Sequence, residues 1–84
     1  MTVLDLAVIC TIKRHERTAK EIVTKLIDEI EEETINYPNI YRVLQKMKKA
    51  GYINSNWEER NKKYRITAKG QNLVNKVLKL GEIQ

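Results

Sequence analysis

Apolar residues recur at helical spacing over most of the chain. Residues 2–13 are apolar on nearly every side, and they predict a helix with Thr2 as its N-cap and Asp5 in its first turn. A helix that is apolar all round is normally buried all round. In so small a protein, we expect one side of this helix to face the core and another side to face a partner chain.

A polar connection at residues 13–17 precedes a second predicted helix. Thr18 and Glu21 have the spacing of a capping box, in which each residue bonds the backbone of the other. Apolar residues continue at helical spacing from Ile22 to Ile30. The helix then runs into the acidic residues 31–33, where negative charge opposes the helix dipole and predicts fraying.

A third helix is predicted to start near Pro38, because proline is accepted at the first helical position. Tyr37, just before it, is interpreted as a hydrophobic staple. Apolar residues at positions 40, 43, 44 and 47 define the buried face of this helix. Gly51 is a typical residue for ending it.

The pattern then changes to two short strand candidates, at residues 52–57 and 63–67. Residues 58–62 between them are entirely polar, as the tip of a hairpin should be. Thr67 can cap a last helix over residues 68–80. The predicted order is helix, helix, helix, β-hairpin, helix, in one domain that covers residues 1–84. This mainly α fold with a small β-hairpin has the elements of a winged helix-turn-helix. In such a fold, the later of the two successive helices before the hairpin lies in the major groove of DNA.

The second half of the chain carries a distinctive set of residues at fixed spacing: Ile40, Tyr41, Leu44, Met47, Gly51, Tyr52, Ile53, Trp57, Lys63, Tyr64, Ile66, Thr67 and Gly70. With this set, residues 36–75 resemble the PadR-like transcriptional regulators. This resemblance implies sequence-specific transcriptional regulation, with a dimer built through the first and last helices. The expected dimerisation residues are Val3, Leu4, Val8, Leu73, Val77 and Leu80.

Charge is distributed unevenly along the 84 residues. Residues 1–33 carry five basic and eight acidic side chains, a net charge of −3, whereas residues 34–84 carry eleven basic and three acidic ones, a net charge of +8. Only the second part is suited to face a polyanion. This supports double-stranded DNA as the partner.

The third predicted helix carries the residue types that read base edges. Asn39, Arg42 and Lys46 lie along one line of its outward side. Arginine suits a bidentate contact to guanine and asparagine suits adenine, so we predict base contacts by Asn39 and Arg42 and a phosphate contact by Lys46. The alternative interpretation is a solvated helix face.

Basic side chains of the hairpin are predicted to contact phosphates: Arg60, Lys62, Lys63 and Arg65. The Tyr41 hydroxyl either reaches a phosphate or belongs to core packing. Thr18 and Lys20 begin the second helix, where a phosphate can bind, or Thr18 acts as a cap alone. Trp57 is interpreted as a core or hairpin anchor, with ligand stacking as the alternative.

The sequence does not indicate an enzyme. It has no nucleophile–base pair and no phosphate-binding loop, and its single histidine, His15, lies in a polar connection. We therefore expect no catalytic residue, no metal and no cofactor. The single cysteine, Cys10, is predicted to be a small buried hydrophobe, as fits a reducing cytosol. No signal peptide or membrane span is apparent, so a cytoplasmic protein is expected.

The function that best fits these features is a homodimeric, sequence-specific DNA-binding regulator that represses by occluding a promoter. Two alternatives stay open: a winged-helix adaptor for protein interaction, and a non-specific nucleic-acid-binding protein. The sequence does not identify an effector, and a small-molecule site would have to lie between subunits.

Overall fold

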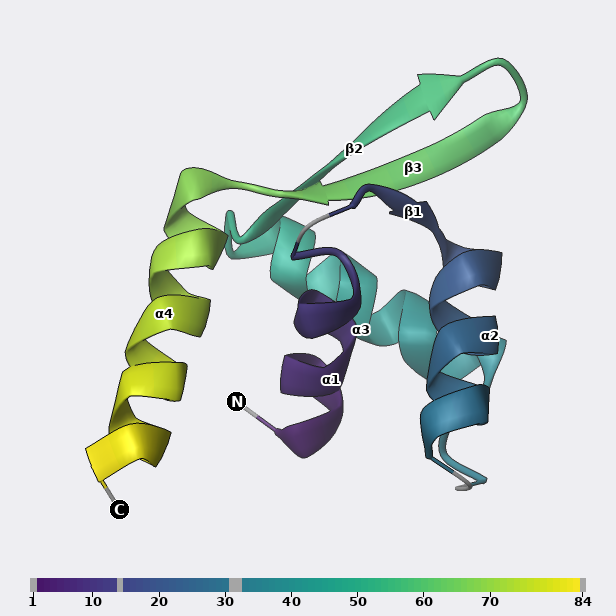
Figure 1. The fold of residues 1–84 in the computed structure, drawn as a ribbon. Helices are drawn as coiled ribbons and strands as arrows, with labels where there is room; N and C mark the ends of the chain where they lie inside the picture. The colour runs from purple at the N-terminus through teal and green to yellow at the C-terminus, as the bar shows by residue number, and fades with distance from the viewer. Residues whose placement is uncertain (1, 14, 31–32, 84) are drawn as a thin grey trace.

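The protein is seen in a computed structural model that describes residues 2–13, 15–30 and 33–83, with side chains described up to Leu80. Within these ranges the elements run α1 (Val3–Thr11), β1 (Arg17–Thr18), α2 (Ala19–Glu29), α3 (Tyr37–Lys49), β2 (Ile53–Glu58), β3 (Asn61–Ile66) and α4 (Ala68–Ile83). Figure 1 shows the sheet extending along one side of the helices, with both chain ends on the other side. The predicted winged helix-turn-helix fold is confirmed.

The helix starts predicted from capping patterns are present. Thr2 caps α1 and forms a reciprocal pair with Asp5, and Thr18 forms the same pair with Glu21 at the start of α2. Each pair satisfies backbone N–H groups that the first helical turn leaves without a partner. Fraying was predicted in the acidic run at residues 31–33, of which residues 31 and 32 lie outside the described residues. Residue 14, in the polar connection that precedes α2, also lies outside them.

The third helix begins one residue earlier than the proline suggested. Asn36 is its N-cap, and its side-chain oxygen accepts a hydrogen bond from the Asn39 N–H at 3.0 Å. Tyr37 is therefore the first residue of the helix, and its interpretation as a staple ahead of the helix is wrong. Gly51 has φ +85° just after α3, the left-handed conformation in which glycine commonly ends helices.

The hairpin is longer, and its tip tighter, than predicted. Glu58 pairs with Asn61, so the tip is only Glu59 and Arg60 instead of residues 58–62, and Glu59 takes a positive φ of 58°. A third strand was missed: β1 pairs with β3 through Arg17 opposite Tyr64 and Thr18 opposite Lys63. A two-residue strand has too little periodicity to be recognised along the chain. Its pairing ties the start of α2 to the hairpin.

The helix α4 is fastened to the end of α3 through one threonine. The Thr67 hydroxyl accepts from the Gly70 N–H at 3.1 Å and donates to the Gly51 carbonyl at 2.7 Å, and the Thr67 N–H donates to the Tyr52 carbonyl at 3.1 Å. The predicted capping role of Thr67 is confirmed. A methyl group on Gly70 would overlap the Tyr52 carbonyl, which explains a glycine inside a helix at this point.

A single apolar core lies among the helices and under the base of the sheet. It is formed by the inward residues Val8, Ile9, Ile12, Ala19, Ile22, Val23, Leu26, Ile35, Ile40, Val43, Leu44, Met47, Ile53, Tyr64 and Val74. All four apolar positions predicted for the buried face of α3 are in this core, so the orientation of α3 about its axis is determined by packing. Cys10 is exposed on α1, and its prediction as a buried residue is wrong.

Candidate nucleic-acid interface

The outward side of α3 carries exposed polar residues. Arg42, Gln45 and Lys49 all lie opposite the buried residues of this helix and are exposed. None of the three makes a hydrogen bond or an ion pair within the described parts of the chain. Three side chains that can donate hydrogen bonds are therefore available to a partner along more than one turn of helix.

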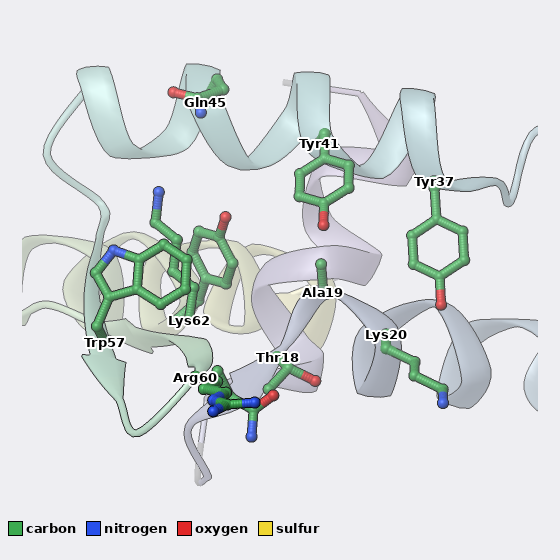
Figure 2. Close-up of a pocket in the computed structure, with 11 residues that line it drawn as sticks. Thr18, Ala19, Lys20, Tyr37, Tyr41, Gln45, Trp57, Arg60 and Lys62 are labelled. Carbon is green, nitrogen blue, oxygen red and sulfur yellow. The ribbon is translucent and has the colours of Figure 1, made fainter.

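A groove of about 420 Å³ separates α3 from the hairpin and the start of α2. Figure 2 shows its walls, to which α2 contributes Lys20, α3 contributes Tyr41 and the hairpin contributes Trp57. Its full lining is Thr18, Ala19, Lys20, Tyr37, Tyr41, Gln45, Trp57, Arg60, Asn61, Lys62 and Tyr64. The groove thus combines aromatic rings with basic side chains, and it opens beside the exposed side of α3.

The aromatic residues of the groove are held in a defined arrangement. Tyr37 and Tyr41 lie one helical turn apart with stacked rings, whose centroids are 6.3 Å apart. The Lys62 ammonium lies 6.0 Å from the Trp57 ring centroid and 5.8 Å from that of Tyr64, so it is positioned by both rings. Burial, and then the neighbouring Tyr41, raise the pKa of Tyr64, which keeps its hydroxyl protonated and neutral.

Trp57 is not a core residue, because it is 70% exposed and lines the groove. It is paired with Lys62 across the hairpin, so the two side chains lie on the same face. Trp57 was interpreted as a core or hairpin anchor, and the part of that interpretation that places it in the core is wrong. Its contact with Lys62 fits the part that makes it a hairpin anchor.

The predicted basic cluster of the hairpin is divided between two faces. Side chains alternate along a strand, so Lys62 shares its face with the inward residue Tyr64, while Lys63 and Arg65 are on the opposite face. Lys63 pairs with Glu58 at 3.1 Å, and Arg65 pairs with Glu16 at 3.1 Å. The hydrogen bond and charge of Glu58 raise the pKa of Lys63. Only Arg60 and Lys62 of the four predicted hairpin cations line the groove.

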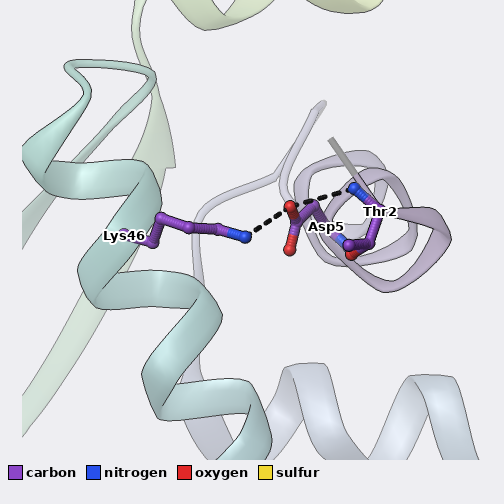
Figure 3. Close-up of polar contacts among 3 residues, drawn as sticks. All are labelled: Thr2, Asp5 and Lys46. Atoms are coloured by element: carbon purple, nitrogen blue, oxygen red, sulfur yellow. Dashed lines mark hydrogen bonds and ion pairs between the residues drawn. The ribbon is translucent and has the colours of Figure 1, made fainter.

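The other flank of α3 is occupied by contacts within the chain. The Asn39 amide donates to the Thr34 carbonyl at 3.0 Å, and the Lys46 ammonium contacts Asp5 at 2.6 Å. Figure 3 shows Asp5 on α1 between Lys46 and the Thr2 backbone. The predicted line of Asn39, Arg42 and Lys46 is therefore divided, since two of its members have partners on the side of α3 away from the groove.

The Asp5–Lys46 contact joins α1 to α3. Asp5 is only 2% exposed, and its Oδ2 accepts from the Thr2 N–H at 3.1 Å as well as from Lys46, while its buried Oδ1 has no hydrogen-bond partner among the described residues. Burial opposes ionisation, but the hydrogen bonds from Lys46 and Thr2 outweigh it, and the pKa of Asp5 is lowered. Release of Lys46 would leave a buried carboxylate with less compensation, so this lysine has a structural role.

The start of α2 is occupied by its own cap. The Thr18 hydroxyl accepts from the Glu21 N–H at 3.2 Å, and the Thr18 N–H donates to the Glu21 carboxylate at 3.0 Å. The bond from the Thr18 backbone lowers the pKa of Glu21, which is thus held ionised at this helix end. A carboxylate here occupies the helix end that was predicted to take a phosphate, whereas Lys20 is exposed in the groove with its charge available.

The residues expected at a dimer contact differ in exposure. Val3 is 82% and Leu80 64% exposed, and Leu4, Leu73 and Val77 are partly exposed. Val8 is fully buried in the core of a single chain, so its assignment to a dimer surface is wrong. Leu78 on α4 is exposed and was not included in the prediction.

Other kinds of site receive no support from the described residues. No three His, Cys, Asp or Glu side chains among them are grouped closely enough to hold a metal ion. No helix in the described part of the chain is both long enough and apolar enough to cross a membrane.

The fold and the groove define a winged helix-turn-helix protein, with α3 as its exposed helix and the β2–β3 hairpin as its wing. The family model of the PadR-like transcriptional regulators matches residues 8–76, and the chain belongs to this family. The family is one of transcriptional regulators. A comparison with curated proteins gives no match.

Solved structures show the same fold. A PadR family transcription regulator from Clostridium difficile has 15% sequence identity and a TM-score of 0.87, over 98% of this chain and 90% of that one. A transcriptional regulator from Clostridium thermocellum has 24% identity and a TM-score of 0.81, over 95% and 81%. Bacillus subtilis PadR in complex with operator DNA has 20% identity and a TM-score of 0.77, over 93% of this chain and 47% of that one.

Proposed function

We propose that this protein is a sequence-specific regulator that binds double-stranded DNA in the cytoplasm, with α3 in the major groove and the wing beside it. The observation that carries the proposal is the continuity of two surfaces: the exposed polar side of α3 borders the groove that contains Lys20, Arg60 and Lys62. A duplex can therefore meet base-reading and phosphate-binding side chains together. The similar fold of Bacillus subtilis PadR, which was solved with operator DNA, supports this assignment.

In this arrangement one DNA strand follows the groove between α3 and the wing. Lys20, Arg60 and Lys62 supply positive charge to its phosphates. The hydroxyl of Tyr41 supplies a neutral hydrogen-bond donor from the opposite wall. Lys63 and Arg65 are on the other face of the hairpin and pair with acidic residues, so we assign them a smaller part in binding than the sequence suggested.

We propose further that the protein acts as a homodimer and represses transcription by covering a promoter. The exposed apolar residues of α1 and α4, Val3, Leu78 and Leu80, offer a surface that a second copy can bury. A dimer of this kind would place its two α3 helices about 34 Å apart, on half-sites about 10 base pairs apart.

The test is fluorescence anisotropy of the protein with duplex DNA at a series of salt concentrations. If three or more phosphates are neutralised, the logarithm of the association constant falls with the logarithm of salt concentration with a slope of about −2.7 or steeper. Binding that does not respond to salt, or no binding at low salt, would contradict the proposal. A stable protein partner found under the same conditions would instead favour an adaptor.

A further inference from the structure

The polar residues of α3 fall into two groups that the sequence does not distinguish. Asn39, Lys46 and Lys48 are engaged within the chain, by the Thr34 carbonyl, by Asp5 and by the Ser55 hydroxyl at 2.7 Å. Arg42, Gln45 and Lys49 have no such contact among the described residues. The contacts of the first group fix the direction in which its side chains point and use part of their hydrogen-bonding capacity, whereas the side chains of the second group keep their full capacity for a partner.

Gln45 is the member of the second group whose position and chemistry suit a base edge. It lies on α3 at the border of the groove, one turn beyond Tyr41 (Figure 2). Its side-chain amide carries both a donor and an acceptor, which match N7 and the N6 amino group of adenine. Lys49 is in the last turn of α3, and it has only donors on a flexible stem.

We infer that Gln45 determines specificity by reading an adenine, next to a guanine read by Arg42. This inference rests on the proposed DNA-binding function and replaces Asn39 as the adenine-reading residue. Arg42 and Gln45 are three positions apart, which is about 4.5 Å along the helix, and neighbouring base pairs are about 3.4 Å apart. Adjacent or nearly adjacent base pairs are therefore the expected targets.

The test is selection of bound duplexes from a random pool by the intact protein and by three variants. The unchanged protein is expected to select a guanine with an adenine beside it in each half-site. Gln45→Glu should replace that adenine by cytosine, because a carboxylate accepts from the cytosine N4 amino group. Gln45→Ala should weaken the preference for adenine over the other bases by roughly 5- to 150-fold, and only at this base position.

Asn39→Ala is the matched control, because Asn39 is the other residue of this helix suited to adenine. It should leave the selected sequence unchanged. Base frequencies are compared within each selected pool, so the added negative charge of Gln45→Glu, which weakens binding to every sequence, does not affect the comparison. Gln45 is exposed and has no partner in the described structure, and thermal unfolding of each variant checks that the fold is retained.

The outcomes separate two failures. If the unchanged protein selects a sequence but Gln45→Glu selects the same one, or if Asn39→Ala alters the adenine position, the role of Gln45 is wrong and the proposed function stands. If the unchanged protein binds no duplex, or selects no sequence, sequence-specific binding is wrong and the role of Gln45 fails with it.

Discussion

At the scale of single residues, several side chains make sense only through neighbours far away in the chain. Gly70 is an unfavourable residue for a helix by propensity, yet the Tyr52 carbonyl and the Ile66 side chain leave no space for a larger residue. Lys62 resembles the other lysines of the hairpin in the sequence, but only this one lies against Trp57 and Tyr64 in the groove. Such roles are not visible in a local pattern.

Gly70→Ala tests the first of these roles. Alanine favours a helix by about 1 kcal/mol over glycine in the absence of other contacts. Here we expect it to lower the free energy of unfolding by roughly 1–3 kcal/mol, because backbone must shift to accommodate the methyl group. Urea unfolding measures the change, with the exposed Asn72→Ala on the same helix as a control that should stay within about 0.5 kcal/mol. Stabilisation by Gly70→Ala would contradict the steric explanation.

Lys62→Met tests the groove as a path for phosphates. Removal of one phosphate contact should make the slope of log association constant against log salt concentration shallower by about 0.9. The measurement is anisotropy with one duplex at several salt concentrations. Lys76→Met removes an exposed lysine of α4 that does not line the groove, and it should leave the slope unchanged. Equal effects of both variants would show that only the net charge matters.

At the scale of elements, the contact between α1 and α3 is the feature with the clearest physical signature. The buried carboxylate of Asp5 keeps a lowered pKa because Lys46 and Thr2 donate to it. A group whose pKa is lower in the folded than in the unfolded state stabilises the fold above its ordinary pKa, here 3.8. That contribution is lost as the pH falls through the lowered value.

Asp5→Asn should therefore be destabilising at neutral pH and much less so in acid. A hydrogen bond to a charged group contributes about 1.5–3 kcal/mol, and the low end applies here because Lys46 is 59% exposed. Urea unfolding at pH 7 and pH 3 should show the difference between the two proteins shrinking on acidification. Asp28→Asn, at an exposed aspartate of α2, is the control. A difference that is the same at both pH values would argue against the ion pair.

At the scale of the whole molecule, the groove and the exposed aliphatic residues of α1 and α4 lie in different places. The groove is formed by α3, the wing and the start of α2, whereas Val3 is exposed at the start of α1 and Leu78 and Leu80 are exposed near the end of α4. Figure 1 shows the sheet and the chain ends on opposite sides of the molecule. A partner copy and a DNA duplex could then bind without competing for the same surface.

Leu80→Glu tests the proposed dimer. Burial of one leucine contributes about 1.5–3 kcal/mol, so its replacement should weaken dimerisation by more than about tenfold. Analytical ultracentrifugation over a range of concentrations measures the dissociation constant. Thr24→Glu places the same charge on the exposed surface of α2 and should have little effect. If the unchanged protein is monomeric at all concentrations, the proposed dimer is wrong.

Much of the fold follows from local rules that act along the chain. The caps at Thr2 and Thr18, the apolar face of α3 and the glycine that ends it were all correctly predicted, because each involves residues within about one helical turn. The resemblance to PadR-like regulators was confirmed by the family match. The sequence alone also located the basic part of the chain.

Only the tertiary structure decided which polar residues remain available to a partner. The line of Tyr37, Tyr41 and Gln45, at i, i+4 and i+8, can be seen in the sequence, but not the fact that it lines a groove closed by the start of α2 and the wing. Likewise, the contact of Lys46 with Asp5 joins residues 41 positions apart, and the missed strand β1 exists only through its pairing with β3. Periodicity shows which side of a helix is buried, whereas packing of distant segments determines what each exposed flank meets.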